Sequence, residues 1–91
     1  MEVLHRRNSL GQLYLLWEKD DKTIISNNSN RITVDQKLDT INRCWYHWQM
    51  KGEAIQVAFP MLSGAEREFI LTGITSEQWN DIFSEKEENE S

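Results

Sequence analysis

The residues best suited to chemistry are Cys44 and His47, which stand three positions apart in the aromatic run 43–48. This spacing places a thiol and an imidazole within one helical turn and supplies half of a structural zinc site, which needs four ligands. Cys44 is the only cysteine, and the other histidine, His5, is distant in the sequence. A thiol nucleophile would further need an oxyanion donor, for which the pattern gives no candidate. We therefore expect no metal site, and we interpret Cys44 as a small buried hydrophobe.

A second candidate is the run Glu66-Arg67-Glu68, which combines two carboxylates with a guanidinium. The run falls in the first turn of a predicted helix, where the helix dipole favours acidic residues without any catalytic role. The four glycines are isolated from one another, so no phosphate-binding loop is present. We expect a protein that is not an enzyme, with no catalytic residues and no cofactor.

The aromatic content is less ordinary, because the chain has four tryptophans: Trp17, Trp45, Trp48 and Trp79. The simplest interpretation is that these large side chains fill a small core. The alternative is a binding surface, since Trp, Tyr and Arg dominate interface hot spots. We take Arg43, Tyr46, His47 and Trp48 as candidate partner-binding residues. Stacking on a base or nucleotide is a third interpretation, weakened by the scarcity of nearby cations.

The net charge of −5 is concentrated towards the C-terminus. Residues 85–91 hold four glutamates and nothing apolar, which predicts a disordered acidic tail after a single domain at residues 1–84. The acidic balance disfavours direct binding of duplex DNA. Mimicry of a nucleic acid by the acidic half is an alternative, although the charge is small for that purpose.

Cysteine usage and the length of apolar runs indicate the cellular compartment of the protein. A lone cysteine rules out an internal disulfide and suggests a reducing environment. The longest apolar run, residues 13–17, is far shorter than the roughly 20 residues of a membrane span. The first residues lack the apolar stretch of a signal peptide. We expect a cytoplasmic protein that does not associate with membranes.

The first third of the chain is predicted to be β-structure. Residues 12–17 alternate as a strand with apolar side chains on both faces, which predicts that both faces are covered. Residues 18–21 supply a turn, and residues 22–26 form the antiparallel partner strand. The Asn-rich stretch 27–30 is a second turn, and 31–34 a short third strand.

The longest predicted helix spans residues 34–51. Its apolar stripe has alternating spacings of four and three residues: Val34, Leu38, Ile41, Trp45 and Trp48. Thr33 and Gln36 have the spacing of a capping box at its start, and Gly52 follows its end.

Two short helices, 64–73 and 76–84, are predicted to end the domain. Ser63 with Glu66 and Thr75 with Gln78 form capping boxes, and Gly73 between them should adopt a left-handed conformation. Residues 53–59, before Pro60, fit a strand or a helix equally well, and both remain open. The last helix lacks lysine and arginine up to residue 84, so this pair should not read DNA.

Trp79 lies four positions after Thr75, at the spacing of a hydrophobic staple with Ile74. We expect it to bury most of its ring. The predicted class is therefore α+β: an N-terminal antiparallel hairpin or three-stranded meander packed on one long helix, followed by a short C-terminal helical pair.

The last third of the chain also resembles a group of small proteins encoded by bacteriophages and prophages. They carry a similar FP-x-LS-x-x-EREF-(I/L)-x-(T/S)GI segment, matched here by Phe59-Pro60, Leu62-Ser63, residues 66–70 and residues 72–74. Some relatives continue with a cysteine pair where this chain has Ile74 and Thr75, so a metal role does not carry over.

The resemblance implies an accessory phage protein acting in the host cytoplasm. We expect a protein-binding protein that modulates or inhibits a host complex, such as defence or transcription machinery. Two alternatives stay open: a small-ligand or nucleotide binder that uses the Trp-rich helix, and an acidic nucleic-acid mimic.

Overall fold

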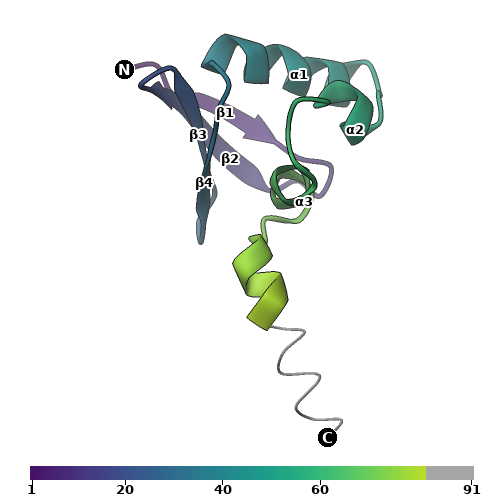
Figure 1. The fold of residues 1–91 in the computed structure, drawn as a ribbon. Coiled ribbons are helices and arrows are strands. Elements are labelled where there is room, and N and C mark those ends of the chain that lie inside the picture. The colour runs from purple at the N-terminus through teal and green to yellow at the C-terminus, as the bar shows by residue number, and fades with distance from the viewer. Residues whose placement is uncertain (82–91) are drawn as a thin grey trace, which may run out of the picture.

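The computed structural model describes residues 1–81 and confirms the α+β class, with a sheet followed by helices (Figure 1). The strands are β1 (Leu4–Arg7), β2 (Leu13–Lys19), β3 (Lys22–Ser26) and β4 (Arg31–Val34). The helices are α1 (Leu38–Met50), α2 (Ile55–Ala58) and α3 (Gly64–Thr72), and residues 76–81 are also helical. The predicted end of the last helix and the predicted tail, 85–91, lie outside the described residues.

The four strands form an antiparallel sheet in chain order, β1-β2-β3-β4. The predicted meander comprises β2 to β4, and β1 is an additional edge strand that pairs with β2. Asp20 and Asp21 both have positive φ, 54° and 64°, which is the signature of the two-residue type I′ hairpin between β2 and β3.

Strand β1 was missed in the sequence because Arg6 and Arg7 make it look like a polar terminus. Arg6 lies on the inner face together with half-buried Leu4. Its guanidinium donates to Asn42 Oδ1 of α1, from Nε at 3.0 Å and from Nη2 at 2.8 Å. A long basic side chain can bury its stem in this way while its head is hydrogen-bonded. The contact joins the edge of the sheet to the long helix.

All three labelled helices lie on one side of the sheet (Figure 1). The core lies between the sheet and the helices. It consists of buried residues, among them Tyr14, Ile25, Phe59 and Trp45 of α1. Trp45 packs edge-on or tilted against Tyr14 and Phe59 at ring-centroid distances of 5.6 and 5.9 Å, a geometry that stabilises aromatic pairs.

The prediction that both faces of the first predicted strand are covered is wrong. Leu16 of β2 is completely buried under the helices, whereas Leu13 is 42% exposed on the opposite face. Helices α1 to α3 lie over one face of the sheet (Figure 1). Apolar side chains also occur on the other face, so the alternation pattern alone did not show which face is covered.

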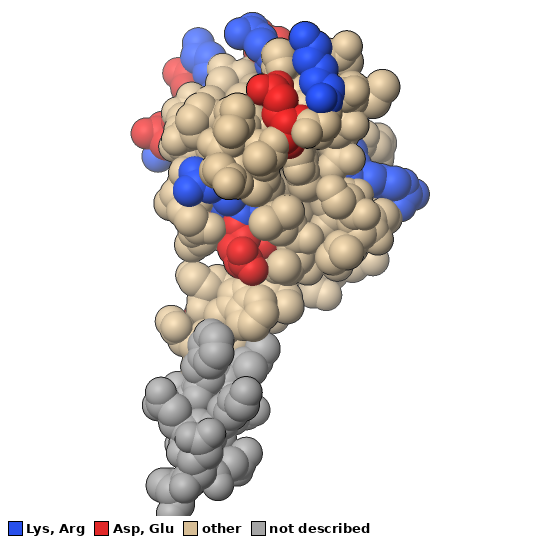
Figure 2. Space-filling model, turned by 90° about the vertical axis from the view of Figure 1, so that its right-hand side faces the viewer, with Lys and Arg blue, Asp and Glu red and all other residues tan. Residues whose placement is uncertain are grey.

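The surface on the side of α2 carries mixed charges. Figure 2 shows basic and acidic side chains close together near the top of this view, and further charged side chains scattered among uncharged ones below them. None of the helices in residues 1–81 is long and apolar enough to cross a membrane.

The start of α1 differs from the prediction. The helix begins at Leu38, Lys37 occupies the N-cap position without a side-chain cap, and Thr33 belongs to β4. Gln36 caps nothing, although its backbone oxygen accepts a 2.7 Å hydrogen bond from Thr23 Oγ1. The predicted capping box is therefore wrong, because pairing with β3 keeps the chain extended through Val34.

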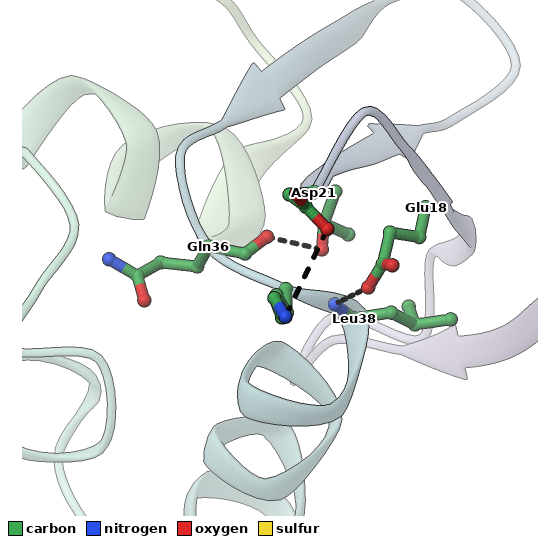
Figure 3. A network of polar contacts seen from close by, with 6 residues as sticks. Glu18, Asp21, Gln36 and Leu38 are labelled. Atoms are coloured by element: carbon green, nitrogen blue, oxygen red, sulfur yellow. Dashed lines mark hydrogen bonds and ion pairs between the residues drawn. The ribbon is translucent and has the colours of Figure 1, made fainter.

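A tertiary contact replaces that box (Figure 3). Glu18 of β2 accepts the backbone N–H of Leu38 at 2.8 Å, and Lys37 lies 3.9 Å from Asp21 of the β2–β3 turn. The hairpin tip thus fixes where the helix begins.

The capping boxes and the glycine turn predicted for the C-terminal part are confirmed. Ser63 and Glu66 form the reciprocal capping box, and Gly73 follows α3 with φ of 79°. Thr75 and Gln78 exchange hydrogen bonds of 3.2 and 3.3 Å, as predicted. Residues 55–58 form a single helical turn, which resolves the open choice in favour of helix.

Trp79 has intermediate exposure, so most of the residue is covered. The turn before it is held to the sheet, because Asn27 and Asn30 both donate side-chain hydrogen bonds to the Gly73 oxygen, at 3.1 and 3.0 Å. The Asn-rich turn therefore serves as an anchor for the C-terminal segment.

Candidate functional site

The four candidate partner-binding residues do not share one surface. Arg43 and Tyr46 are exposed on α1, and Tyr46 retains 53% of its accessible area. His47 is half-buried, with Nδ1 2.7 Å from Glu53 Oε2. Trp48 is 8% exposed, and its ring packs edge-on against Trp45 at 5.7 Å. Its side chain belongs to the core and is not a surface contact.

Arg43 and Tyr46 line a groove between the edge strand β1 and helix α1. The groove has a volume of about 760 Å³, within the ~300–1,000 Å³ of typical ligand pockets. Trp45 contributes to its lining from the core, and Met50, which is 73% exposed, contributes at the end of α1. Strand β1 contributes Arg6. We call this surface the β1–α1 groove.

Two carbonyl groups of β1 already accept hydrogen bonds from side chains at the groove. Arg6 Nη1 donates to the His5 oxygen at 2.8 Å, and Trp45 Nε1 donates to the Arg7 oxygen at 2.9 Å. An exposed edge strand normally invites another strand to pair with it, and occupied acceptors oppose such pairing. The groove therefore offers side chains to a partner instead of a backbone ladder.

The groove is basic within an acidic protein. Among residues 1–81, three arginines line it, Arg6, Arg7 and Arg43, and the one lining carboxylate is Asp39. Arg43 lies 3.3 Å from Asp39 in an exposed i,i+4 pair, which contributes at most about 0.5 kcal/mol. Arg43 can exchange that partner for another carboxylate at little cost, so the groove suits a ligand that combines an apolar group with negative charge.

Cys44 is not suited to nucleophilic chemistry. It is 8% exposed, and its Sγ lies 4.0 Å from Met61 Sδ. Burial raises the pKa of the thiol, and the opposing effect of Arg43 is smaller. The thiol stays protonated near neutral pH and is a weak nucleophile. Within residues 1–81 there is also no cluster of three or more His, Cys, Asp or Glu side chains that could hold a metal ion.

Sequence reasoning found one wall of the groove and missed the other. Arg43 and Tyr46 were identified because they lie off the apolar stripe of the helix. Arg6 of β1 was missed, since its proximity to α1 depends on how the strand packs against the helix, and Met50 at the end of α1 was missed as well. The only signal was the Arg6-Arg7 pair itself, two cations together in an acidic chain.

Comparison with known proteins gives no further guidance. A scan against protein-family models, a search of curated proteins and a search of solved structures each returned no match. The resemblance to small phage-encoded proteins stays a prediction.

Proposed function

We propose that this chain is a small, non-enzymatic protein-binding protein and that the β1–α1 groove is its contact surface. The observation that carries the proposal is the placement of exposed Tyr46 and Met50 beside Arg6 and Arg43 in one groove. Tyr and Arg are enriched among interface hot spots, and Met adapts its shape to a partner.

The groove favours a particular partner chemistry. An apolar or aromatic side chain would insert between Tyr46 and Met50, while carboxylates beside it would meet the arginines. The resemblance of residues 59–74 to phage proteins supports a host protein as the partner. We therefore propose a cytoplasmic modulator or inhibitor of a host complex, in defence or transcription.

Affinity capture from bacterial lysate, read by mass spectrometry, tests the proposal. Tyr46→Ala and Arg43→Glu should each lose the protein that the unaltered chain retains. Val57→Ala and Lys51→Glu are matched controls, because both side chains are exposed but do not line the groove. Equal capture by all four variants would mean that partners bind elsewhere.

A nucleotide or similar small anion is a second candidate, favoured by the volume of the groove and by the arginines that line it. Trp45 also lines the groove, so a bound nucleotide should quench tryptophan fluorescence. Saturable quenching that Arg43→Glu abolishes would favour this function over protein binding.

A further inference from the structure

The face of the sheet opposite the helices is apolar at its centre. The strand register places the side chains of Leu13, Leu15, Trp17 and Ile24 together on this outer face. Leu13 is 42% exposed, and the other three are of intermediate exposure. An antiparallel sheet with one solvated face usually carries polar residues there. The apolar side chains here are not required by the core, which lies on the other side.

The same face is basic at its margins. The register adds five further residues with basic or titratable side chains: His5, Arg7, Lys19, Lys22 and Arg31. No strand residue on this face is Asp or Glu, although the chain as a whole has a net charge of −5. Glu18 points to the opposite face, where it accepts the Leu38 amide, and Asp20 and Asp21 form the hairpin tip, where Asp21 pairs with Lys37.

One cross-strand pair works against the stability of the sheet. Lys19 and Lys22 are direct partners in the β2–β3 register, and like charges placed opposite each other are destabilising. Binding to an acidic surface would offset the repulsion between these two lysines.

The composition of the outer face distinguishes between classes of partner. Trp17 is the only Phe, Tyr or Trp among the strand residues of this face, and the Arg31 guanidinium already lies 5.7 Å from its ring centroid. Single-stranded nucleic acids usually stack on several aromatic rings, so one occupied ring and three aliphatic side chains fit a protein better. A second copy in a symmetric dimer would bring the same cations face to face.

We propose that this outer face is a second docking surface, which binds an acidic region of a partner protein. The apolar side chains of that region would cover Leu15, Trp17 and Ile24, and its carboxylates would pair with Arg7, Lys22 and Arg31. This is the usual anatomy of an interface, with a desolvated apolar centre and a polar rim. The face adjoins the β1–α1 groove at His5 and Arg7, which belong to both surfaces, but its apolar centre lies outside the groove.

The test maps backbone amide shifts by NMR on the full chain. The probe is a synthetic peptide of glutamates with interspersed leucines. The outer-face amides, and the indole N–H of Trp17, should shift on titration. The double variant Lys22→Glu with Arg31→Glu should weaken binding by about tenfold or more, as charge reversal at a contact does.

The matched control is Lys37→Glu with Lys51→Glu, which changes the net charge equally at exposed positions outside this face. It should retain the affinity within about twofold, because screening limits the influence of remote surface charges. Equal weakening by both double variants would reduce the effect to net charge and overturn the proposal. So would an absence of outer-face shifts, or loss of peptide binding in Tyr46→Ala, which would place the peptide in the groove.

Two further titrations decide between occupants. A peptide with lysine in place of glutamate should not bind. Oligo-thymidylate should bind more weakly than the acidic peptide, and equal or tighter binding would assign the face to nucleic acid. Deletion of residues 85–91 should leave the outer-face signals unchanged, and a shift would identify the chain's own acidic residues as the occupant.

Discussion

Glu18 Oε1 accepts the backbone N–H of Leu38 at 2.8 Å, so a side chain of β2 caps a helix that begins 20 residues later. A carboxylate at this position satisfies a free amide of the first turn and interacts favourably with the helix dipole. The contact determines where α1 begins, and α1 in turn forms one wall of the β1–α1 groove.

Removing this cap should cost measurable stability. Glu18→Ala should lower the free energy of unfolding by about 1 kcal/mol, the usual effect of deleting an N-cap. Thr33→Ala, at the residue of the predicted capping box, should change it by less than about 0.5 kcal/mol, as surface substitutions usually do. Urea denaturation of both variants provides the comparison. A larger loss of stability for Thr33→Ala than for Glu18→Ala would support a capping box formed by Thr33 and Gln36.

The contrast between these two residues explains which parts of the fold could be predicted from sequence. The Ser63–Glu66 box and the left-handed Gly73 depend on groups a few residues apart, so their spacing was sufficient. The start of α1 and the strand β1 depend on partners far along the chain, at Glu18 and Asn42. For the same reason only the α1 wall of the groove could be predicted. The uncovered face of the sheet could not be predicted, because it depends on where the helices pack.

The two faces of α1 should respond differently to truncation. Trp45→Ala should lose about 3–5 kcal/mol of stability, because it leaves a large cavity at a residue that is only 2% exposed. Tyr46→Ala should change stability by less than about 0.5 kcal/mol, since its ring is largely exposed. Thermal melts in which Tyr46→Ala is as damaging as Trp45→Ala would contradict this assignment of faces.

Substitutions at Gly73 and Gly52 allow the cost of backbone strain to be distinguished from the cost of a steric clash. Both have positive φ, 79° and 72°, but a Cβ at Gly73 would lie 2.8 Å from Asn27 Nδ2, whereas one at Gly52 would meet nothing within 4 Å. Alanine at either position should cost about 1 kcal/mol for the left-handed backbone. Gly73→Ala should cost more than Gly52→Ala, because it also displaces the Asn27 amide from the Gly73 oxygen. Equal losses in denaturant melts would show that Asn27 adapts freely.

Two buried titratable groups, Tyr14 and Cys44, should make the stability of the protein depend on pH in the alkaline range. Burial is the main cause that raises the pKa of Tyr14 above its ordinary 10.0 and that of Cys44 above 9.0. The folded state therefore holds these protons more tightly than the unfolded state. Stability should be unaffected below about pH 9 and should fall as the pH rises above it, since ionisation then favours unfolding. Cys44→Ala should remove the part of this decline that begins near pH 9.

Cys44 also permits a direct measurement of burial. Because the thiol is covered and protonated, a disulfide reagent at neutral pH should label it slowly in the native protein and rapidly in denaturant. Rapid labelling without denaturant would show that the region around Cys44 and Met61 opens readily.

Asn8 joins the β1–β2 loop to the end of α3 through both ends of its amide. Its Nδ2 donates to the backbone oxygens of Ile70 and Leu71 at 3.0 and 3.1 Å, and its Oδ1 accepts the amides of Leu10 and Gln12 at 3.0 and 2.8 Å. The residue is 4% exposed, and these bonds are buried or partly buried. Asn8→Ala should therefore cost about 2–4 kcal/mol, because several buried groups lose their partners.

Asn8→Asp isolates the donor half of this contact. The introduced carboxyl keeps its acceptor oxygens but, when ionised, places a negative charge against the carbonyls of Ile70 and Leu71. Burial and these dipoles should raise its folded pKa above the ordinary value of about 3.9. The protonated form can donate as the amide does, so the deficit relative to the unaltered chain should be largest at neutral pH. It should shrink as the pH falls through the raised pKa. Denaturant melts of both proteins between neutral pH and pH 4 measure this, and a deficit independent of pH would mean that the donor contacts contribute little.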